Sequence, residues 1–104
     1  MIKVVSIWQL PPGMAEDEFE RWYVGKHVPD AQKIPGLRRY TINRVIPEER
    51  ASSRFYRMAE LSFDSIEAAR SAFESAEWKY AFADAKPYIG DFMRFYFDSQ
   101  DIVR

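Results

Sequence analysis

The 104-residue sequence has no cysteine, a single histidine and only four glycines. Without cysteine the chain cannot form disulfides, thiolate nucleophiles, iron–sulfur clusters or cysteine-based zinc sites. One histidine excludes a multi-histidine metal site within one chain, and the few glycines form no phosphate-binding loop. The sequence also lacks a serine nucleophile motif and a calcium-loop motif. We therefore expect no metal and no cofactor, while a mixed metal site shared by two chains is left open.

Charge and hydropathy restrict the partners as well. The formal net charge is −1, so the overall attraction on which nucleic-acid binders depend is missing. Arg38 and Arg39 make no basic patch, because neighbouring strand residues point to opposite faces. No apolar run approaches the roughly 20 residues of a membrane span, and the N-terminal residues read as a first strand, not a signal peptide. We expect a cytoplasmic protein, because the lack of cysteine fits a reducing compartment, with neither nucleic acid nor membrane as partner.

The order of elements predicts one domain over residues 1–104. Apolar residues make up 47% of the chain and charged residues 30%, as is typical of a globular protein. Strands are expected over residues 2–10, 37–46, 54–63 and 91–97. Helices are expected over about 16–28, where Pro29 kinks the helix or begins a new short turn through Ile34. Two more are expected from an N-cap at Asp64 with Glu67 at N3, and from an N-cap at Ser75 to a stop at Pro87. This β-α-β-β-α-β order predicts a ferredoxin-like α+β fold, whose antiparallel four-stranded sheet carries helices on one face.

Aromatic side chains exceed what one face of such a sheet can bury. The chain has three tryptophans, six tyrosines and eight phenylalanines, and the strands carry aromatics on both parities. Four aromatics of roughly 150–250 Å² each would exceed the roughly 300–600 Å² of the largest apolar patch on a typical monomer. We expect four on the uncovered face: Trp8, Tyr40, Tyr56 and Tyr96. Two-fold pairing with a second copy would bury them, so we predict a homodimer.

The only histidine lies at the end of an apolar helical stripe. Phe19, Trp22, Tyr23 and His27 follow an i, i+3, i+4, i+8 spacing, which places them on one helix face. A helix that buries this face carries the imidazole inward, where it can act as a general acid–base. The C-terminal end of the helix favours the imidazolium and burial favours the neutral ring, so the balance stays open. The alternative is a structural histidine with a satisfied hydrogen bond.

These residues also carry a resemblance to a known family. The elements Phe19-x-x-Trp22-Tyr23-x-x-x-His27 and Pro35-Gly36-Leu37-x-x-Tyr40 resemble the EthD-like family of the dimeric α/β-barrel superfamily. Three later elements extend the resemblance over nearly the whole chain: Trp78, Asp84 and Ile89-x-Asp91. The resemblance implies a ferredoxin-like fold, a dimer and a pocket between helices and sheet. The family and its relatives include proteins of unknown role, dehydratases, decarboxylases and cyclases of aromatic polyketides, and lactone isomerases. The superfamily also holds haem-binding enzymes and cofactor-free monooxygenases.

Further side chains are candidates for the same pocket. Tyr23 and Tyr40 could donate hydrogen bonds to a developing oxyanion, and Asp30 could orient the His27 ring. The aromatic residues expected to contact a ligand are Trp8, Trp22, Tyr56 and Trp78. A plain packing role is the alternative for each of these aromatic residues.

Two carboxylates in or beside strands are expected to have different roles. Glu60 lies in an otherwise apolar strand, where a raised pKa would suit acid–base work. The alternative is a cross-strand ion pair with one of three arginines: Arg39, Arg57 or Arg94. Asp91 opens the last strand and is expected to serve in a turn or cap.

The sequence thus predicts a small homodimer with a pocket for a small hydrophobic molecule. The leading hypothesis is a cofactor-independent dehydratase, isomerase, cyclase or decarboxylase that acts on a cyclic or aromatic metabolite, with His27 as acid–base. A non-catalytic binding or accessory protein is one alternative, because binding and catalytic pockets use the same residue types. A haem-binding protein or monooxygenase, with His27 as axial ligand, is the other.

Overall fold

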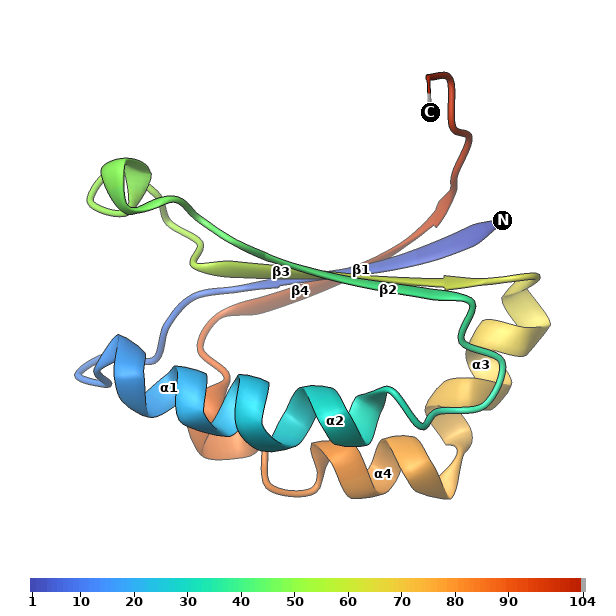
Figure 1. Cartoon of the computed structure of the whole chain (residues 1–104), viewed down its shortest axis with the longest axis horizontal. Helices are drawn as coiled ribbons and strands as arrows, with labels where there is room; N and C mark the ends of the chain where they lie inside the picture. The colour runs from blue at the N-terminus through green and yellow to red at the C-terminus, as the bar shows by residue number, and fades with distance from the viewer. Residues whose placement is uncertain (104) are drawn as a thin grey trace.

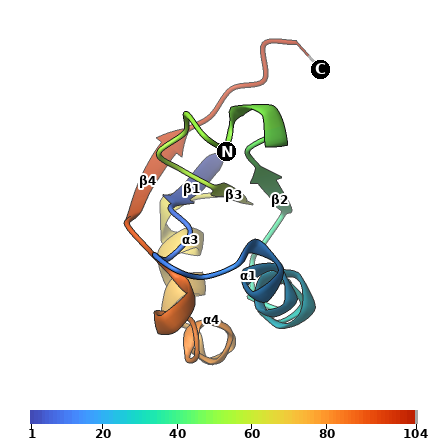
Figure 2. The same cartoon turned by 90° about the vertical axis from the view of Figure 1, so that its left-hand side faces the viewer.

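Four antiparallel strands and one layer of helices make up the computed structural model, which describes residues 1–103. The strands pair in the order β2-β3-β1-β4, and they are β1 (Ile2–Trp8), β2 (Arg39–Arg44), β3 (Arg57–Phe63) and β4 (Phe92–Asp98). The helical segments are α1 (Glu16–Trp22), the π-helix η1 (Tyr23–His27), α2 (Val28–Ala31), η2 (Pro47–Glu49), α3 (Ile66–Glu74), α4 (Ala76–Phe82) and η3 (Lys86–Tyr88). The α-helices cover one face of the sheet and leave the other open (Figure 1 and Figure 2). The predicted ferredoxin-like α+β fold is confirmed.

The strands are one to three residues shorter at some ends than the sequence pattern predicts, but each lies inside or within one residue of its expected range. None of the helices described over residues 1–103 is long and apolar enough to cross a bilayer.

The first helix changes its winding where it reaches the candidate site. α1 runs directly into η1, and α2 follows. Pro29 gives a physical reason, because in a regular α-helix its ring would clash with the carbonyl of Gly25 and it has no N–H to offer. The wider turn relieves this conflict, and the Val28 N–H donates to the Tyr23 carbonyl five residues back. The kink expected at Pro29 is therefore a π turn that ends two residues before it.

Serine side chains begin both later helices. Ser75 accepts a hydrogen bond from the Trp78 N–H and caps α4, as predicted. The cap of α3 is Ser65, whose Oγ accepts from the Ala68 N–H at 3.1 Å. The expected N-cap at Asp64 is wrong by one residue. The Asp64 carboxylate instead pairs with the Arg38 guanidinium at 2.8 Å on the surface, so it is not free to cap.

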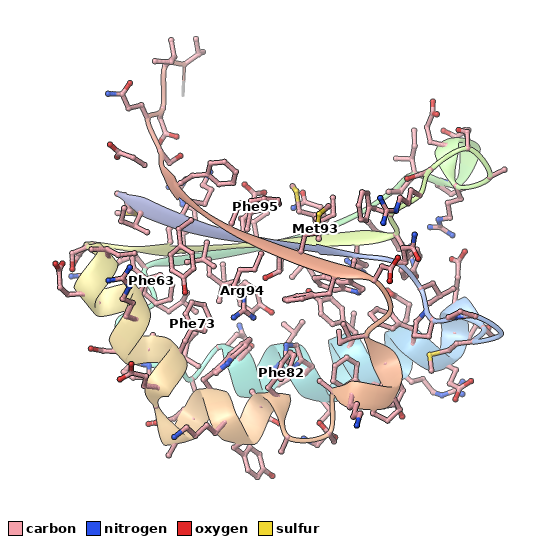
Figure 3. The ribbon with its side chains drawn as sticks, turned by 180° about the vertical axis from the view of Figure 1, so that it is seen from behind. Phe63, Phe73, Phe82, Met93, Arg94 and Phe95 are labelled. Carbon is pink, nitrogen blue, oxygen red and sulfur yellow. The ribbon has the colours of Figure 1, made fainter. Side chains whose placement is uncertain are left out.

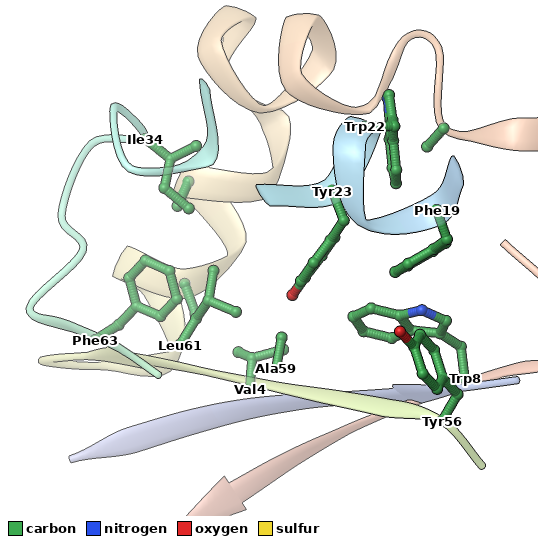
Figure 4. Close-up of a cluster of buried hydrophobic side chains, with 13 residues drawn as sticks. Val4, Trp8, Phe19, Trp22, Tyr23, Ile34, Tyr56, Ala59, Leu61 and Phe63 are labelled. Carbon is green, nitrogen blue, oxygen red and sulfur yellow. The ribbon is translucent and has the colours of Figure 1, made fainter. Parts of the chain in front are cut away.

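The strand register determines which side chains face the helices. On β1, Val4, Ser6 and Trp8 point to the helices, and the residues paired with them on β3 and β4 share that face. Trp8 and Tyr56 are buried in the core, where Figure 4 shows them below Phe19 of α1.

Tyr40 and Tyr96, which were expected on the uncovered face, also lie on the helix side of the sheet. Tyr40 pairs with Leu61 on the helix side, and the Tyr96 ring meets Phe73 of α3. The expectation that Trp8, Tyr40, Tyr56 and Tyr96 lie on the uncovered face is therefore wrong. The reason is that aromatics occur on both parities, so alternation alone does not show which parity the helices cover.

The uncovered face is apolar along β4. Met93, Phe95 and Phe97 are 38%, 45% and 48% exposed, and they pair across the strand with Ile7, Val5 and Lys3 of β1. Figure 3 shows Met93 and Phe95 on the side of the sheet away from the helices. Glu60 lies on this face, where Lys3 approaches its carboxylate at 3.3 Å. The ion pair is therefore with a lysine and not with any of the three arginines considered.

The cap assignment makes one prediction. Ser65→Ala should lower the free energy of unfolding by about 1 kcal/mol, because the Ala68 N–H loses its acceptor. Asp64→Ala should lower it less, because the Arg38–Asp64 pair is exposed and screened. Urea unfolding of both variants measures this, and the reverse order would restore Asp64 as the cap.

The exposed row on β4 makes a second prediction. We expect light scattering to give twice the chain mass of 12.3 kDa for the wild type and a single chain mass for Phe95→Glu. In a dimer formed through this row, each introduced carboxylate would be buried in the interface without a cation to pair with. Tyr80→Glu, at a 65% exposed aromatic on α4, is the matched control and should stay dimeric. A monomeric wild type at micromolar concentration would contradict the predicted homodimer.

Candidate functional site

The predicted helical stripe is buried, with His27 at its end. Phe19, Trp22, Tyr23 and His27 are each at most 7% exposed. The imidazole packs nearly parallel to two of these rings, with centroids 5.0 Å from Trp22 and 5.7 Å from Tyr23. Trp78 and Phe82 of α4 approach it edge-on at 6.0 and 6.2 Å. Four aromatic rings therefore pack around the imidazole.

One hydrogen bond fixes the orientation of this ring. His27 Nδ1 lies 2.8 Å from the carbonyl oxygen of Ala81, which is 54 residues away on α4. A carbonyl only accepts, so the neutral imidazole must carry its proton on Nδ1. Nε2 is left with a lone pair. Asp30 does not orient the ring as expected: its carboxylate pairs with Lys26 at 3.0 Å and with Lys33 at 4.0 Å.

Burial decides the charge of His27. Removal from water lowers the pKa of the imidazole below its usual value. The Ala81 carbonyl, Asp84 and Asp30 act in the opposite direction, and burial prevails. The balance left open by the sequence thus falls on the neutral side. A neutral imidazole with a fixed tautomer can accept a proton at Nε2.

Two tyrosines place hydroxyls close to this imidazole. Burial raises the pKa of the Tyr23 phenol far above its usual range, and its neighbour Tyr40 adds to the rise. Burial likewise raises the pKa of Tyr40. The Tyr23 hydroxyl is enclosed, and the phenol of Tyr40 is the polar group close to it, although no hydrogen bond between residues 1–103 satisfies this hydroxyl. Figure 4 shows this hydroxyl pointing from the helix toward the sheet. Both phenols can donate and neither ionises near neutral pH.

A cavity of about 30 Å³ brings these groups together. That volume holds about two water molecules. Its lining residues come from all four strands, η1, α4 and the segment before β4: Ser6, Trp8, Tyr23, His27, Tyr40, Ala59, Leu61, Trp78, Phe82, Ile89, Phe92 and Arg94. Five of the eight residues predicted for the site are among them.

The other three predicted residues lie outside the lining. Trp22 stacks on Tyr88 with centroids 4.5 Å apart, behind His27. The Tyr56 hydroxyl donates to Glu20 at 2.9 Å, and the Asp30 carboxylate is on the outer side of α2, occupied by lysines. Asp91 was expected in a turn or cap, and its carboxylate pairs with the Arg54 guanidinium at 3.4 Å.

Arg94 is the charged lining residue that sequence reasoning missed as part of the site, and the Ser6 hydroxyl beside it was missed as well. The sequence pattern offers Arg94 only as a partner for Glu60, which lies on the opposite face. The alternation along β4 could have indicated its place, because Arg94 shares one face of the strand with Phe92 and Tyr96. Once helices are known to cover that side, an arginine there must be inside.

With the side chains as they stand, a haem has no room beside His27, because the cavity measures about 30 Å³ and aromatic rings pack closely around the imidazole. Among residues 1–103, no three histidine or carboxylate side chains come together as metal ligands. The chemistry open to this arrangement is proton transfer by an imidazole with phenol donors beside it.

Comparisons with known proteins agree with this fold. Residues 11–91 match the EthD domain. An uncharacterized 11.0 kDa protein from Rhodococcus erythropolis, encoded in the thcB-thcC intergenic region, is 28% identical over 103 residues, which are 99% of this chain and 98% of that protein. The crystal structure of an ethyl tert-butyl ether D (EthD) family protein from Bacillus halodurans superposes with a TM-score of 0.83 at 27% identity, covering 96% of this chain and 99% of that one.

Two solved structures of lower identity share the fold alone. A dimeric ferredoxin-like protein of unknown function from Thermobifida fusca has a TM-score of 0.76 at 16% identity, covering 92% of this chain and 88% of its own. SnoaB, a cofactor-independent oxygenase from Streptomyces nogalater, has a TM-score of 0.73 at 14% identity, covering 98% and 95%. Since the EthD domain spans most of the sequence, this chain belongs to the EthD domain family.

Proposed function

We propose that this protein is a cofactor-independent enzyme that abstracts a proton from a hydrophobic cyclic or aromatic metabolite, with His27 as the base. One observation carries the proposal. The Nδ1–H of a buried neutral imidazole is held by the Ala81 carbonyl at 2.8 Å, while its ring lines the same cavity as the unpartnered Tyr23 hydroxyl. A base and an oxyanion donor in one apolar space suit proton removal beside a carbonyl.

The first step follows from these positions. Nε2 of His27 takes the proton from the carbon next to a substrate carbonyl, and the C–H electron pair becomes the carbon–carbon double bond of an enolate. Charge gathers on the substrate oxygen, where Tyr23 or Tyr40 donates a hydrogen bond. The imidazolium that forms is stabilised by the Ala81 carbonyl and by the charges of Asp84 and Asp30. Return of the proton from the imidazolium to another carbon completes an isomerisation. In a dehydration, the enolate expels a hydroxyl group from the next carbon, which takes that proton and leaves as water.

The cavity must widen when a substrate binds. Pockets for small molecules usually measure roughly 300–1,000 Å³, which is at least about ten times the cavity of about 30 Å³. The inner wall of Trp8 and Tyr23 is buried, whereas Phe92 in the outer wall is 38% exposed. A ring-shaped substrate therefore displaces the outer wall, which consists of side chains from α4 and β4.

The comparisons support the absence of a cofactor requirement only by analogy of fold. SnoaB, which shares the fold, is a cofactor-independent oxygenase, so this architecture is compatible with chemistry by side chains alone. The dimeric neighbour from Thermobifida fusca supports a homodimer in the same way. Neither protein identifies the substrate of this chain.

Deuterium exchange tests the proposal without knowledge of the full reaction. Wild-type protein incubated in D₂O with a neutral aromatic ketone such as 1-tetralone, or with an unsaturated γ-lactone, should speed the loss of the proton next to the carbonyl, as followed by NMR. His27→Gln should slow the exchange by at least about a hundredfold, because a general base contributes roughly 10²–10⁴. Its melting temperature should stay within a few degrees, since the Gln amide can still donate to the Ala81 carbonyl.

Lys26→Gln is the control, because Lys26 is exposed and neighbours His27 without lining the cavity. It should exchange like the wild type. Equal exchange by His27→Gln would overturn the role of His27 as base. Binding of the ketones without exchange in the wild type would instead favour the accessory-protein alternative.

The pKa of His27 also predicts how stability depends on pH. A histidine whose pKa is lowered on folding binds protons more readily in the unfolded chain, so its contribution is complete above about pH 6.5 and is lost below it. The free energy of unfolding of the wild type should therefore fall between pH 7.5 and pH 5. His27→Gln should lack this part of the decline. Urea titrations at four pH values measure it, and parallel curves for the two proteins would show that folding leaves the pKa unchanged.

A further inference from the structure

Arg94 is a charged side chain inside the aromatic layer. It lies on β4 opposite Ser6 of β1, and Figure 3 shows it pointing from the sheet toward the helices, near Phe73 and Phe82. Its guanidinium carbon lies 4.8, 5.2 and 5.4 Å from the ring centroids of Phe73, Phe92 and Trp78. Aromatic faces attract a cation, but they accept no strong hydrogen bonds from its N–H groups.

The guanidinium has little else to bind. Its Nε donates to the Ser6 hydroxyl at 3.3 Å, and no other hydrogen bond or ion pair of this side chain occurs within residues 1–103. Both terminal nitrogens therefore lack a protein acceptor in that part of the chain. Burial in this setting lowers the pKa of the guanidinium, which reflects how poorly the surroundings compensate its charge.

Arg57, on β3 of the same sheet, is a buried arginine whose charge is paired within the chain. It is 7% exposed and donates through Nε to Glu20 at 3.2 Å, with a second contact from a terminal nitrogen to the same carboxylate. Tyr56 donates to that carboxylate too. The charge of Arg57 is thus paired within the chain, and that of Arg94 is not. Arg94 is half-buried against aromatic rings, so an acceptor from outside the chain can reach its free N–H groups and pair its charge.

We infer that Arg94 binds the carboxylate of the molecule that enters the cavity, so that the ligand is a planar aromatic or cyclic acid. The guanidinium is a flat fork of N–H donors that matches the two oxygens of a carboxylate. The cavity walls are aromatic, and they suit the ring that carries this carboxylate. The inference rests on the proposed function for the location of the site, and adds the charge of the substrate.

Trp78 connects this anchor to the proposed base. Its ring lies 6.0 Å from the His27 ring and 5.4 Å from the Arg94 guanidinium carbon, and all three residues line the cavity. A carboxylate held by Arg94 therefore brings its ring beside Trp78 and within the space that His27 also borders. Arg94 acts here as a binding residue that fixes which atom of the substrate reaches Nε2.

Paired ligands test the inference. Isothermal titration calorimetry would compare 2-naphthoate with 2-naphthamide, its neutral isostere, on the wild type, Arg94→Gln and Arg94→Lys. The wild type should bind the carboxylate roughly ten- to a hundredfold more tightly than the amide, as expected for a charge-assisted hydrogen-bonded pair. Arg94→Gln should bind both equally. Arg94→Lys should keep part of the preference, because it retains the charge but loses the fork.

Arg70→Gln is the matched control, since it removes the same charge from an exposed position on α3, and it should keep the full preference. Thermal unfolding of Arg94→Gln should show a melting temperature at or above that of the wild type, because a neutral group is easier to bury. A preference for the carboxylate that survives in Arg94→Gln, or no detectable binding of 2-naphthoate to the wild type at millimolar concentration, would overturn the inference. The proposed function is tested separately, because wild-type deuterium exchange on neutral ketones does not depend on an anion.

Discussion

The hydrogen bond between His27 Nδ1 and the Ala81 carbonyl ties together the two parts of the helical layer. It joins η1 to α4 across 54 residues of sequence, and it does so in a setting with few other polar contacts. Because the acceptor is a backbone oxygen, the bond sets the tautomer of the imidazole as well as its position. The same bond holds α4 where Trp78 and Phe82 can close over the ring. One interaction therefore contributes both to the packing of the helices and to the chemical state of His27, while the exposed Lys26–Asp84 pair adds a second polar link between the same parts of the chain.

The aromatic layer between helices and sheet leaves several polar atoms without partners. Trp8 Nε1, Trp22 Nε1 and the Tyr23 hydroxyl are buried and unbonded among the described residues, and Arg94 has only Ser6. An unsatisfied buried donor weakens a fold by about 1–3 kcal/mol. A core selected for stability alone would avoid this. Three of the residues concerned, Trp8, Tyr23 and Arg94, line the cavity, and all three are donors, so what they lack is an acceptor. An oxygen-bearing ligand would supply it.

Local patterns in the sequence predicted the local structure, and the failures concern which elements meet. The stripe from Phe19 to His27 was predictable because helical periodicity depends on near neighbours, and even the π turn preserves its buried face. Which strand residues face the helices was not predictable from the sequence. Trp8 and Tyr56 could be assigned to the helix side only after the register placed Val4 and Leu61 there. Arg94 was missed for the same reason. Whether a strand arginine has a partner depends on residues far away in the chain, as the contrast with Arg57 shows.

The alternation of β4 links the two faces of the sheet. Phe92, Arg94 and Tyr96 face the helices, and Met93, Phe95 and Phe97 face outward. β4 is an edge strand that pairs only with β1, so its backbone is held on one side. A second copy packed on the outward row would restrain the strand that carries Arg94 and Phe92. Dimerisation and the shape of the outer cavity wall are then two consequences of the same seven residues, because a strand cannot shift one face without moving the other.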